Sequence, residues 1–326
     1  MNIVSAVILL IGGLVILWKC AELLVAGAVA LAERLGVSSL VVGLTVVAMG
    51  TSAPELAASI AGVLRESGGG NLAIGNVFGS NIANLALVGG LVALIRPLRV
   101  KKQTLRREIP VMILVALLLW PFLHDSYLSR PESIALLAVF AVLMLLTIHL
   151  ARKEAGNLKR EAGSAKRDTR HDIRDMKKNV LFIVIGLIGL ALGAKMAVEG
   201  AVFIGVKVGL SKSVIALTII AFGTSLPELV TCLAAAVKGH HDISVGNLVG
   251  SNIFNTLLVV GVAGVVRPFE IGERLAGGTD YWIMIIVSAA FALAVLLGKR
   301  IIGRVSGTLL ICGYVGYIVY LFGYSG

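Results

Sequence analysis

The chain has 326 residues, of which 58% are hydrophobic and 14% are charged, and its formal net charge is +11. Soluble domains carry about 25% charged residues, so this composition excludes an ordinary soluble protein and predicts an integral membrane protein.

Ten apolar segments follow one another, most of them near the ~20 residues that a helix needs to cross the hydrocarbon layer. They lack the alternation that a membrane β-barrel requires. We therefore expect an all-α membrane protein with ten transmembrane helices, at residues 4–32, 38–64, 73–95, 109–123, 131–150, 179–205, 212–237, 243–266, 280–298 and 301–322. The first and sixth are long and should tilt or project beyond the bilayer. The first lacks the basic start of a signal peptide, and we expect it to be retained.

The second segment contains a polar motif, GLTVVAMGTSAPEL, at residues 43–56. Pro54 has no N–H, and its ring clashes with the carbonyl group of Gly50. The helix should therefore kink or unwind near residues 48–51 and leave carbonyl groups free inside the membrane, which requires that they be buried or face water or an ion. Thr51 and Ser52 lie within one helical turn of Glu55, so two hydroxyls and a carboxylate share a face.

The third segment contains a second motif, GNVFGSNIANL, at residues 75–85. Asn76, Ser80 and Asn84 recur every four residues and predict a polar stripe. Gly75 and Gly79 have the small-residue spacing that lets membrane helices approach closely. Close packing would bring the Ser and Asn oxygens to the glutamate.

Both motifs recur in the second half, as ALTIIAFGTSLPEL at residues 216–229 and GNLVGSNIFNT at 246–256, with nine of fourteen and seven of eleven positions identical. The matching residues are Gly223, Thr224, Ser225, Pro227, Glu228, Asn247, Ser251 and Asn255. Contacts between helices would explain a lone Ser or Asn. They do not explain two carboxylates and two helix breakers, and a polar cluster in a membrane marks a functional site by default.

A strongly polar stretch, residues 152–178, predicts a linker between a first five-helix repeat (residues 1–151) and a second (residues 179–326). Five is an odd number, so the second repeat should enter the membrane inverted, as in many secondary transporters. The inverted halves would build one central site between them.

Lys and Arg residues gather in three loops on one side, at 96–107, 152–178 and 299–304. The positive-inside rule makes this side cytoplasmic and predicts a multi-pass plasma (inner) membrane protein with both termini outside. Basic loops that set topology and touch anionic membrane lipid explain the net charge better than nucleic-acid binding does. We expect no nucleic acid and no obligate protein partner.

The carboxylates, hydroxyls and carbonyls form an oxygen-only ligand set, which suits Na⁺, Ca²⁺ or Mg²⁺ rather than softer metals. The five histidines lie in loops or at span ends, and Cys20, Cys232 and Cys312 stand alone, which argues against a zinc or iron site and for inert thiols. Two glutamates would balance one Ca²⁺, and flexible oxygen geometry favours Ca²⁺ over Mg²⁺. We expect transported ions but no cofactor.

Two other intramembrane glutamates have a nearby lysine. Glu22 follows Lys19 by three residues and Glu199 follows Lys195 by four, so each should form a local pair. Glu55 and Glu228 have no Lys or Arg within a turn and must find a cation or a proton.

The paired GTSxPEL and GNxxGSNI motifs resemble the two α-repeats of the cation/Ca²⁺ exchanger superfamily, in its sodium/calcium exchanger branch. This resemblance covers nearly all of the membrane region. By position, it implies that the ion ligands are Thr51, Ser52, Glu55, Ser80, Asn84, Thr224, Ser225, Glu228, Ser251 and Asn255, together with the backbone carbonyls of Ala48 and Ala221. Some members have Asp where this chain has Asn84 or Asn255, and Asp at this point accompanies K⁺ use in potassium-dependent relatives. Here the resemblance therefore implies neither K⁺ transport nor a particular exchange ratio.

The hypothesis from the sequence is a Na⁺/Ca²⁺ antiporter that uses alternating access, with Ca²⁺ leaving the cell. A Ca²⁺/H⁺ exchanger that protonates the same glutamates is the nearest alternative. An ion channel fits inverted repeats around carboxylates less well. An intramembrane enzyme is disfavoured because the chain has no metal-ligand His pair and no GxSxG motif.

Overall fold

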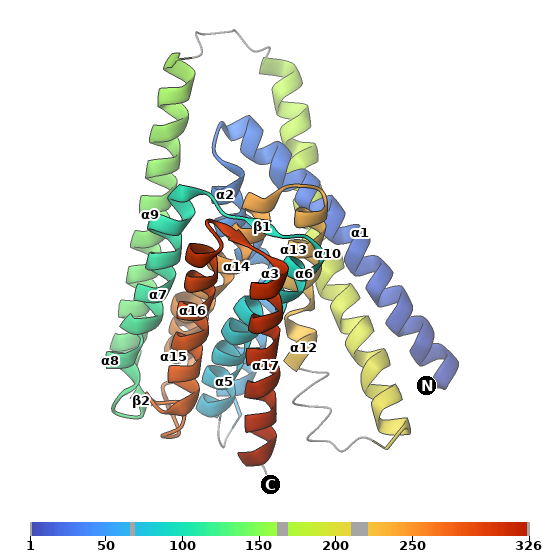
Figure 1. Cartoon of the computed structure of the whole chain (residues 1–326), viewed down its shortest axis with the longest axis vertical. Helices are drawn as coiled ribbons and strands as arrows, with labels where there is room; N and C mark the ends of the chain where they lie inside the picture. Colours follow the sequence, from blue (N-terminus) through green and yellow to red (C-terminus); the bar gives the residue numbers. More distant parts are fainter. Residues whose placement is uncertain (1, 66–68, 162–168, 210–220, 325–326) are drawn as a thin grey trace.

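The computed structural model describes residues 2–65, 69–161, 169–209 and 221–324, and these residues are almost entirely helical (Figure 1). Among them, seven helices are long and apolar enough to cross a membrane. The helical stretches Ser39–Thr51 and Ala53–Val63 meet at a 42° bend, and together they would make an eighth span. The expected all-α membrane architecture is confirmed.

The elements of the first part of the chain are α1 (Ile3–Leu35), α2 (Ser39–Val42), η1 (Gly43–Val47), α3 (Ala48–Thr51), α4 (Ala53–Val63), α5 (Gly69–Ile82), η2 (Ala83–Val88), α6 (Gly89–Ile95), β1 (Leu98–Arg99), η3 (Thr104–Glu108), α7 (Ile109–Leu118), α8 (Trp120–Leu123), β2 (Tyr127–Leu128) and α9 (Arg130–Glu161). Those of the second part are α10 (Thr169–Lys207), α12 (Ala221–Thr224), α13 (Leu226–Val237), α14 (His241–Phe254), η5 (Asn255–Val259), α15 (Val260–Val266), β3 (Phe269–Glu270), α16 (Thr279–Leu297), β4 (Ile301–Ile302) and α17 (Arg304–Tyr324).

These elements follow the expected spans closely. The first and sixth spans become the two longest helices described, α1 with 33 residues and α10 with 39. The fourth span is divided between α7 and α8. The seventh, expected at 212–237, is described only from residue 221, where α12 begins. Helices α9 and α10 both extend into the expected linker, and residues 162–168 between them lie outside the described chain.

Helices α1 and α10 lie side by side, at an angle to the rest of the molecule (Figure 1). Glycines bring their backbones together. A Cβ atom added to Gly13 would lie 2.6 Å from the Ala197 nitrogen, and one added to Gly200 would lie 2.5 Å from the Ala6 oxygen. Such close approach allows the extensive van der Waals contact on which helix association in lipid depends.

Glycine also allows the tight packing expected of the second motif. A Cβ at Gly246 would lie 2.8 Å from the Leu40 oxygen, and one at Gly250 would lie 2.6 Å from the Leu44 oxygen. Helix α14 therefore packs directly on α2 and η1. Gly75 and Gly79 have no described atom within 4 Å of such a Cβ.

The two parts of the chain contact each other reciprocally at both ends. At one end, β1 pairs with β4, and Arg96 donates a hydrogen bond to the Val237 carbonyl that ends α13, at 2.9 Å. At the other end, β2 pairs with β3, and Arg267 donates to the Arg65 carbonyl just beyond α4, at 3.2 Å. Each arginine thus caps the carboxyl end of a helix from the other part of the chain, where a positive charge is favourable.

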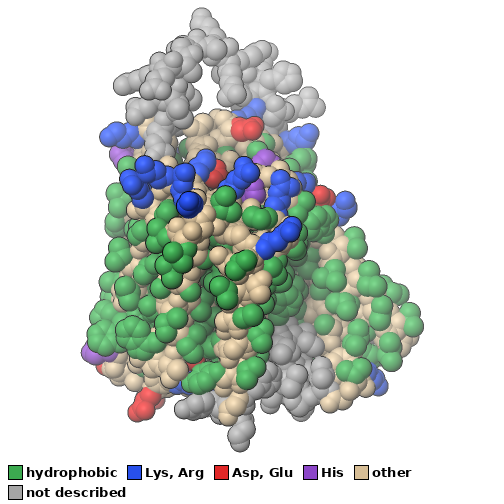
Figure 2. Space-filling model, viewed as in Figure 1, with side chains coloured by type: hydrophobic (Ala, Val, Ile, Leu, Met, Phe, Trp, Pro, Cys, Tyr) green, Lys and Arg blue, Asp and Glu red, His purple; other side chains and the backbone are tan. Residues whose placement is uncertain are grey.

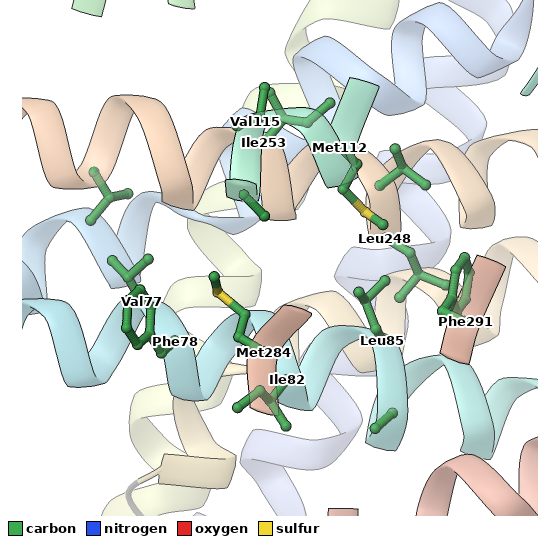
Figure 3. Close-up of a cluster of buried hydrophobic side chains, with 14 of the residues drawn as sticks. Val77, Phe78, Ile82, Leu85, Met112, Val115, Leu248, Ile253, Met284 and Phe291 are labelled. Carbon is green, nitrogen blue, oxygen red and sulfur yellow. The ribbon is translucent and has the colours of Figure 1, made fainter. Parts of the chain in front are cut away.

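The buried core lies between α5, α7, α14 and α16. Figure 3 shows Phe78 of α5 near Met284 of α16, and Leu85 of η2 and Leu248 of α14 near Phe291 of α16. Apolar side chains also cover much of the exterior, and Val305 is 76% exposed. Figure 2 shows this apolar surface below a band of Lys and Arg side chains at the end that holds β1 and β4. Both chain termini lie toward the opposite end (Figure 1).

The contact between α1 and α10 generates a prediction about stability. Replacing Gly13 with Val forces side-chain atoms into the α10 backbone, so we expect a loss of about 1–3 kcal/mol, the usual effect of overpacking. Thermal unfolding of the purified protein in detergent would measure this loss. Gly316→Val in α17 is the control, since no described atom lies within 4 Å of a Cβ there. Equal melting temperatures for the two variants would contradict the proposed close contact.

Candidate functional site

Both GTSxPE motifs interrupt a helix. Ser52 has φ −83° and ψ 5° between α3 and α4, and Ser225 has φ −86° and ψ 2° between α12 and α13. Each proline is the second residue of the helix that follows, a position where its missing N–H is tolerated. The predicted break therefore occurs at the motif, one residue beyond the range expected from Pro54.

The breaks place a glutamate in the first turn of a new helix. Glu55 lies in the first turn of α4 and Glu228 in the first turn of α13. The amino-terminal end of a helix carries a partial positive charge and unpaired N–H groups, which favour a carboxylate at this point. Both side chains are completely buried.

The two motifs also meet each other. The Ser52 hydroxyl donates a hydrogen bond to Glu228 Oε1 at 3.5 Å, and the Ser80 hydroxyl donates to Glu55 Oε1 at 3.5 Å. Thr51 Oγ1 lies 3.1 Å from Asn247 Oδ1, on the other half of the chain. Residues separated by more than 170 positions thus surround one buried region.

Neither glutamate contacts a basic group among the described residues. By contrast, the two local pairs expected from the sequence are present, with Lys19 3.3 Å from Glu22 and Lys195 3.9 Å from Glu199. Glu22 also accepts from Lys238 at 3.2 Å. Glu55 and Glu228 are therefore the unusual carboxylates, since isolated buried charges are very costly.

Several oxygen atoms of the predicted ligands are buried and have no hydrogen-bond partner in the described chain. They are Glu55 Oε2, Asn84 Oδ1, Ser225 Oγ, Glu228 Oε2, Ser251 Oγ and Asn255 Oδ1. A buried oxygen without a partner costs about 1–3 kcal/mol, so a cluster of them calls for an explanation. Carboxylate, hydroxyl and amide oxygens are the ligands that a hard cation takes, so the chemistry of these atoms fits such an ion.

The remaining predicted ligands are placed differently. The Ala48 carbonyl accepts hydrogen bonds from the Ser52 nitrogen and the Thr51 hydroxyl, at 3.0 and 3.4 Å. Thr224 ends α12 and is partly buried, and Ala221 begins α12 with its side chain outside the described residues. The contribution of all twelve predicted ligands to ion binding stays a prediction.

The last asparagine of each GNxxGSNI motif region, Asn84 or Asn255, lies in a wider helical turn. Asn84 lies in η2 and Asn255 begins η5, and both elements are π-helical, with hydrogen bonds between residues five apart. Such turns are rare and occur frequently at functional sites. Nothing in the spacing of the polar stripe indicated them.

A polar contact that the sequence did not predict joins the two GNxxGSNI motifs. The Asn81 amide donates to Thr256 Oγ1 at 3.0 Å, and Asn255 Nδ2 donates to Asn81 Oδ1 at 3.2 Å. The second bond orients the Asn255 amide so that its oxygen is left free. Asn81 and Asn252 are identical in both copies of GNxxGSNI, which was an available signal.

The chain is similar in sequence and in fold to sodium/calcium exchangers. The family model described as "Sodium/calcium exchanger protein" matches residues 5–149 and 178–323. The inner membrane protein YrbG of Escherichia coli is 38% identical over 323 residues, which covers 97% of each chain. The sodium/calcium exchanger MaX1 of Methanosarcina acetivorans is 33% identical over 346 residues, covering 97% of this chain and 98% of that protein. The solved structure of a sodium/calcium exchanger from Methanococcus jannaschii superposes with a TM-score of 0.82 at 29% identity, covering 98% of this chain and 99% of that one.

The asparagine contacts generate a matched prediction. Asn81→Ala leaves Asn255 Nδ2 and Thr256 Oγ1 without these partners, so we expect a loss of about 1–3 kcal/mol. Asn252→Ala is the control at the matching position, because the Asn252 side-chain amide donates to the Leu248 carbonyl of its own helix and to no other described residue. Thermal unfolding in detergent should show the larger loss for Asn81→Ala. A larger loss for Asn252→Ala would contradict the role given to Asn81.

Proposed function

We propose that this chain, which belongs to the sodium/calcium exchanger protein family, exchanges Na⁺ for Ca²⁺ across a membrane and moves Ca²⁺ outward. The observation that carries this proposal is the pair of buried glutamates, Glu55 and Glu228, which have no basic partner in the described chain and lie beside unpaired hydroxyl and amide oxygens. The predicted ligand set would form one cation site between the two motifs.

Coupling follows from the charge of this site. Two carboxylates buried without a cation are too costly to carry through a closed state inside a membrane. One Ca²⁺ or two or more Na⁺ ions would neutralise them, so only the loaded forms should change access from one side to the other. This rule couples the two ion fluxes and prevents simple leakage.

The proposed architecture is a pair of inverted repeats, residues 1–151 and 179–326, joined by the cytoplasmic linker 152–178. The reciprocal pairing of β1 with β4 and of β2 with β3, at opposite ends, supports this arrangement, as do the reciprocal contacts of Arg96 and Arg267. Inverted repeats can exchange conformations and so expose a central site to each side in turn. Helices α1 and α10, which contact each other through glycines, are the proposed sliding element.

The charge distribution supports an orientation. The basic end, which holds β1, β4 and the Lys and Arg band of Figure 2, is proposed to face the cytoplasm of a cell whose plasma (inner) membrane contains the protein. The termini would then lie outside. YrbG, the similar protein from E. coli, carries the description of an inner membrane protein.

The proposed exchange predicts that Ca²⁺ transport depends on both Glu55 and Glu228. Glu55→Gln and Glu228→Gln each remove half of the site's negative charge, so we expect Ca²⁺ uptake into Na⁺-loaded vesicles to fall by at least ~100-fold, the effect of losing about 3 kcal/mol of cation binding. Glu108→Gln is the control, because Glu108 is also buried but lies 3.4 Å from Arg107. It should reduce uptake less than about twofold. Transport that persists in either site variant would overturn the assignment.

The second prediction separates Na⁺ from H⁺ as the driving ion. Proteoliposomes with Na⁺, K⁺ or H⁺ gradients imposed one at a time should accumulate Ca²⁺ only when Na⁺ is more concentrated inside. A protonophore should not reduce that uptake. Ca²⁺ flux that follows a pH gradient and ignores Na⁺ would instead support the Ca²⁺/H⁺ alternative.

A further inference from the structure

We infer that the basic end of the protein holds a specific site for an anionic phospholipid, with the phosphate group between β1, β4 and the start of α14. This inference does not rest on the proposed ion exchange. It arises from a cavity of about 500 Å³ whose lining includes Arg99, Lys101, Lys299 and Arg300.

The charges that line this cavity are largely uncompensated. Lys101 pairs with Asp242 at 2.6 Å, but Arg99, Lys299 and Arg300 form no ion pair with any described residue. Three free cations facing one cavity would attract a group that carries negative charge. Guanidinium groups suit phosphate particularly well because they can donate two parallel hydrogen bonds.

The backbone around the cavity adds to this preference. Helix α14 begins at His241, and no side chain caps its amino-terminal end, so free N–H groups and the partial positive charge of the helix face the same region. His241 Nδ1 is buried and has no hydrogen-bond partner among the described residues. Lys299 and Arg300 have φ values of 50° and 73°, left-handed conformations that non-glycine residues rarely adopt, and this loop presents both of their side chains at the cavity.

A second cavity offers an internal comparison. A cavity of about 500 Å³ at the opposite end is lined in part by residues 69–71 and 270–272, which correspond to 240–242 and 99–101 at a sequence offset of 171, but no counterpart of the Lys299–Arg300 loop lines it. There Glu270 stands in place of Arg99, Gly272 in place of Lys101, and Asn71 in place of Asp242. The cavity at the basic end has Arg99, Lys101, Lys299 and Arg300 against one acidic residue, Asp242. The other cavity has only Arg65 and Arg267 against Glu270. The excess of positive charge is therefore larger at the basic end.

An apolar groove beside the cavity indicates that the anion is a lipid. The groove runs between α16 and α17 and has a volume of about 300 Å³, and its lining includes Leu293, Leu297, Leu309 and Gly313. Leu297 precedes Lys299 by two residues, so groove and cavity are within about 7 Å along the chain. Leu297 is 75% exposed. An acyl chain in this groove would bring the phosphate of the same molecule to the basic cavity.

The test measures lipid binding to the purified full-length protein by native mass spectrometry. We expect dioleoyl phosphatidylglycerol to be retained and dioleoyl phosphatidylcholine to be lost. The variant Arg99→Gln/Lys299→Gln/Arg300→Gln should weaken phosphatidylglycerol binding about tenfold or more, since each basic residue adds to the attraction for anionic lipid. Arg99→Lys/Arg300→Lys keeps the charges but loses the paired guanidinium donors, so it should bind phosphatidylglycerol more tightly than the triple Gln variant and less tightly than the unchanged protein.

Two further variants distinguish a specific lipid site from diffuse attraction to the basic end of the protein. The variant Lys102→Gln/Arg106→Gln/Lys153→Gln removes three exposed charges from the same end but outside the cavity, and it should change binding less than about twofold. Equal losses in the two triple variants would show diffuse attraction and overturn the site. Ala290→Phe should fill the groove and weaken binding of the dioleoyl lipid but not of its dihexanoyl analogue. Inorganic phosphate that binds as tightly as phosphatidylglycerol would show a soluble anion instead of a lipid.

Discussion

The burial of Glu55 and Glu228 without a basic partner in the described chain is the constraint on which the rest of the structure depends. Charge inside a membrane is tolerated only where the protein supplies favourable dipoles or a counter-ion. Helix ends supply the dipoles, so each glutamate requires a helix that starts in the middle of the bilayer. Pro54 and Pro227 mark the starts of these helices. The broken helix must then be shielded by neighbours that approach closely. Helix α14 does so because Gly246 and Gly250 have no side chain at the contact.

Matching asparagines in the two halves of the chain make different hydrogen bonds. Asn81 reaches across to Thr256 and Asn255, whereas Asn252, at the matching position, bonds to its own helix. Similarly, Asn76 donates to Ser59, whereas Asn247 donates to Cys232. Duplicated sequence therefore produces a site that is similar on both sides without being equivalent. Such differences permit the two sides of one central site to bind ions with different affinity.

The sequence predicted the spans and the helix breaks because each depends on local chemistry. The meeting of the two motifs was predicted from their duplication. Apolar length determines a span, and a proline such as Pro54 determines a break. The π-helical turns at Asn84 and Asn255 could not be predicted, since they depend on how neighbouring helices pack rather than on spacing. The bond between Asn81 and Asn255 joins residues 174 positions apart, and no local pattern encodes its geometry. The cavity beside Arg300 likewise requires four separate segments of the chain to meet.

The reciprocal caps have a consequence for how the protein is made. Arg96 donates to the carbonyl of Val237, which follows it by 141 residues. The Arg65 carbonyl accepts from Arg267, which follows it by 202 residues. Contacts of such long sequence separation form late, because the intervening chain must first be synthesised and brought into place. The first half therefore leaves the ribosome with the carboxyl end of α4 uncapped and β2 unpaired. Until the second half has been synthesised, the hydrogen-bonding groups at these two places must be satisfied by other partners.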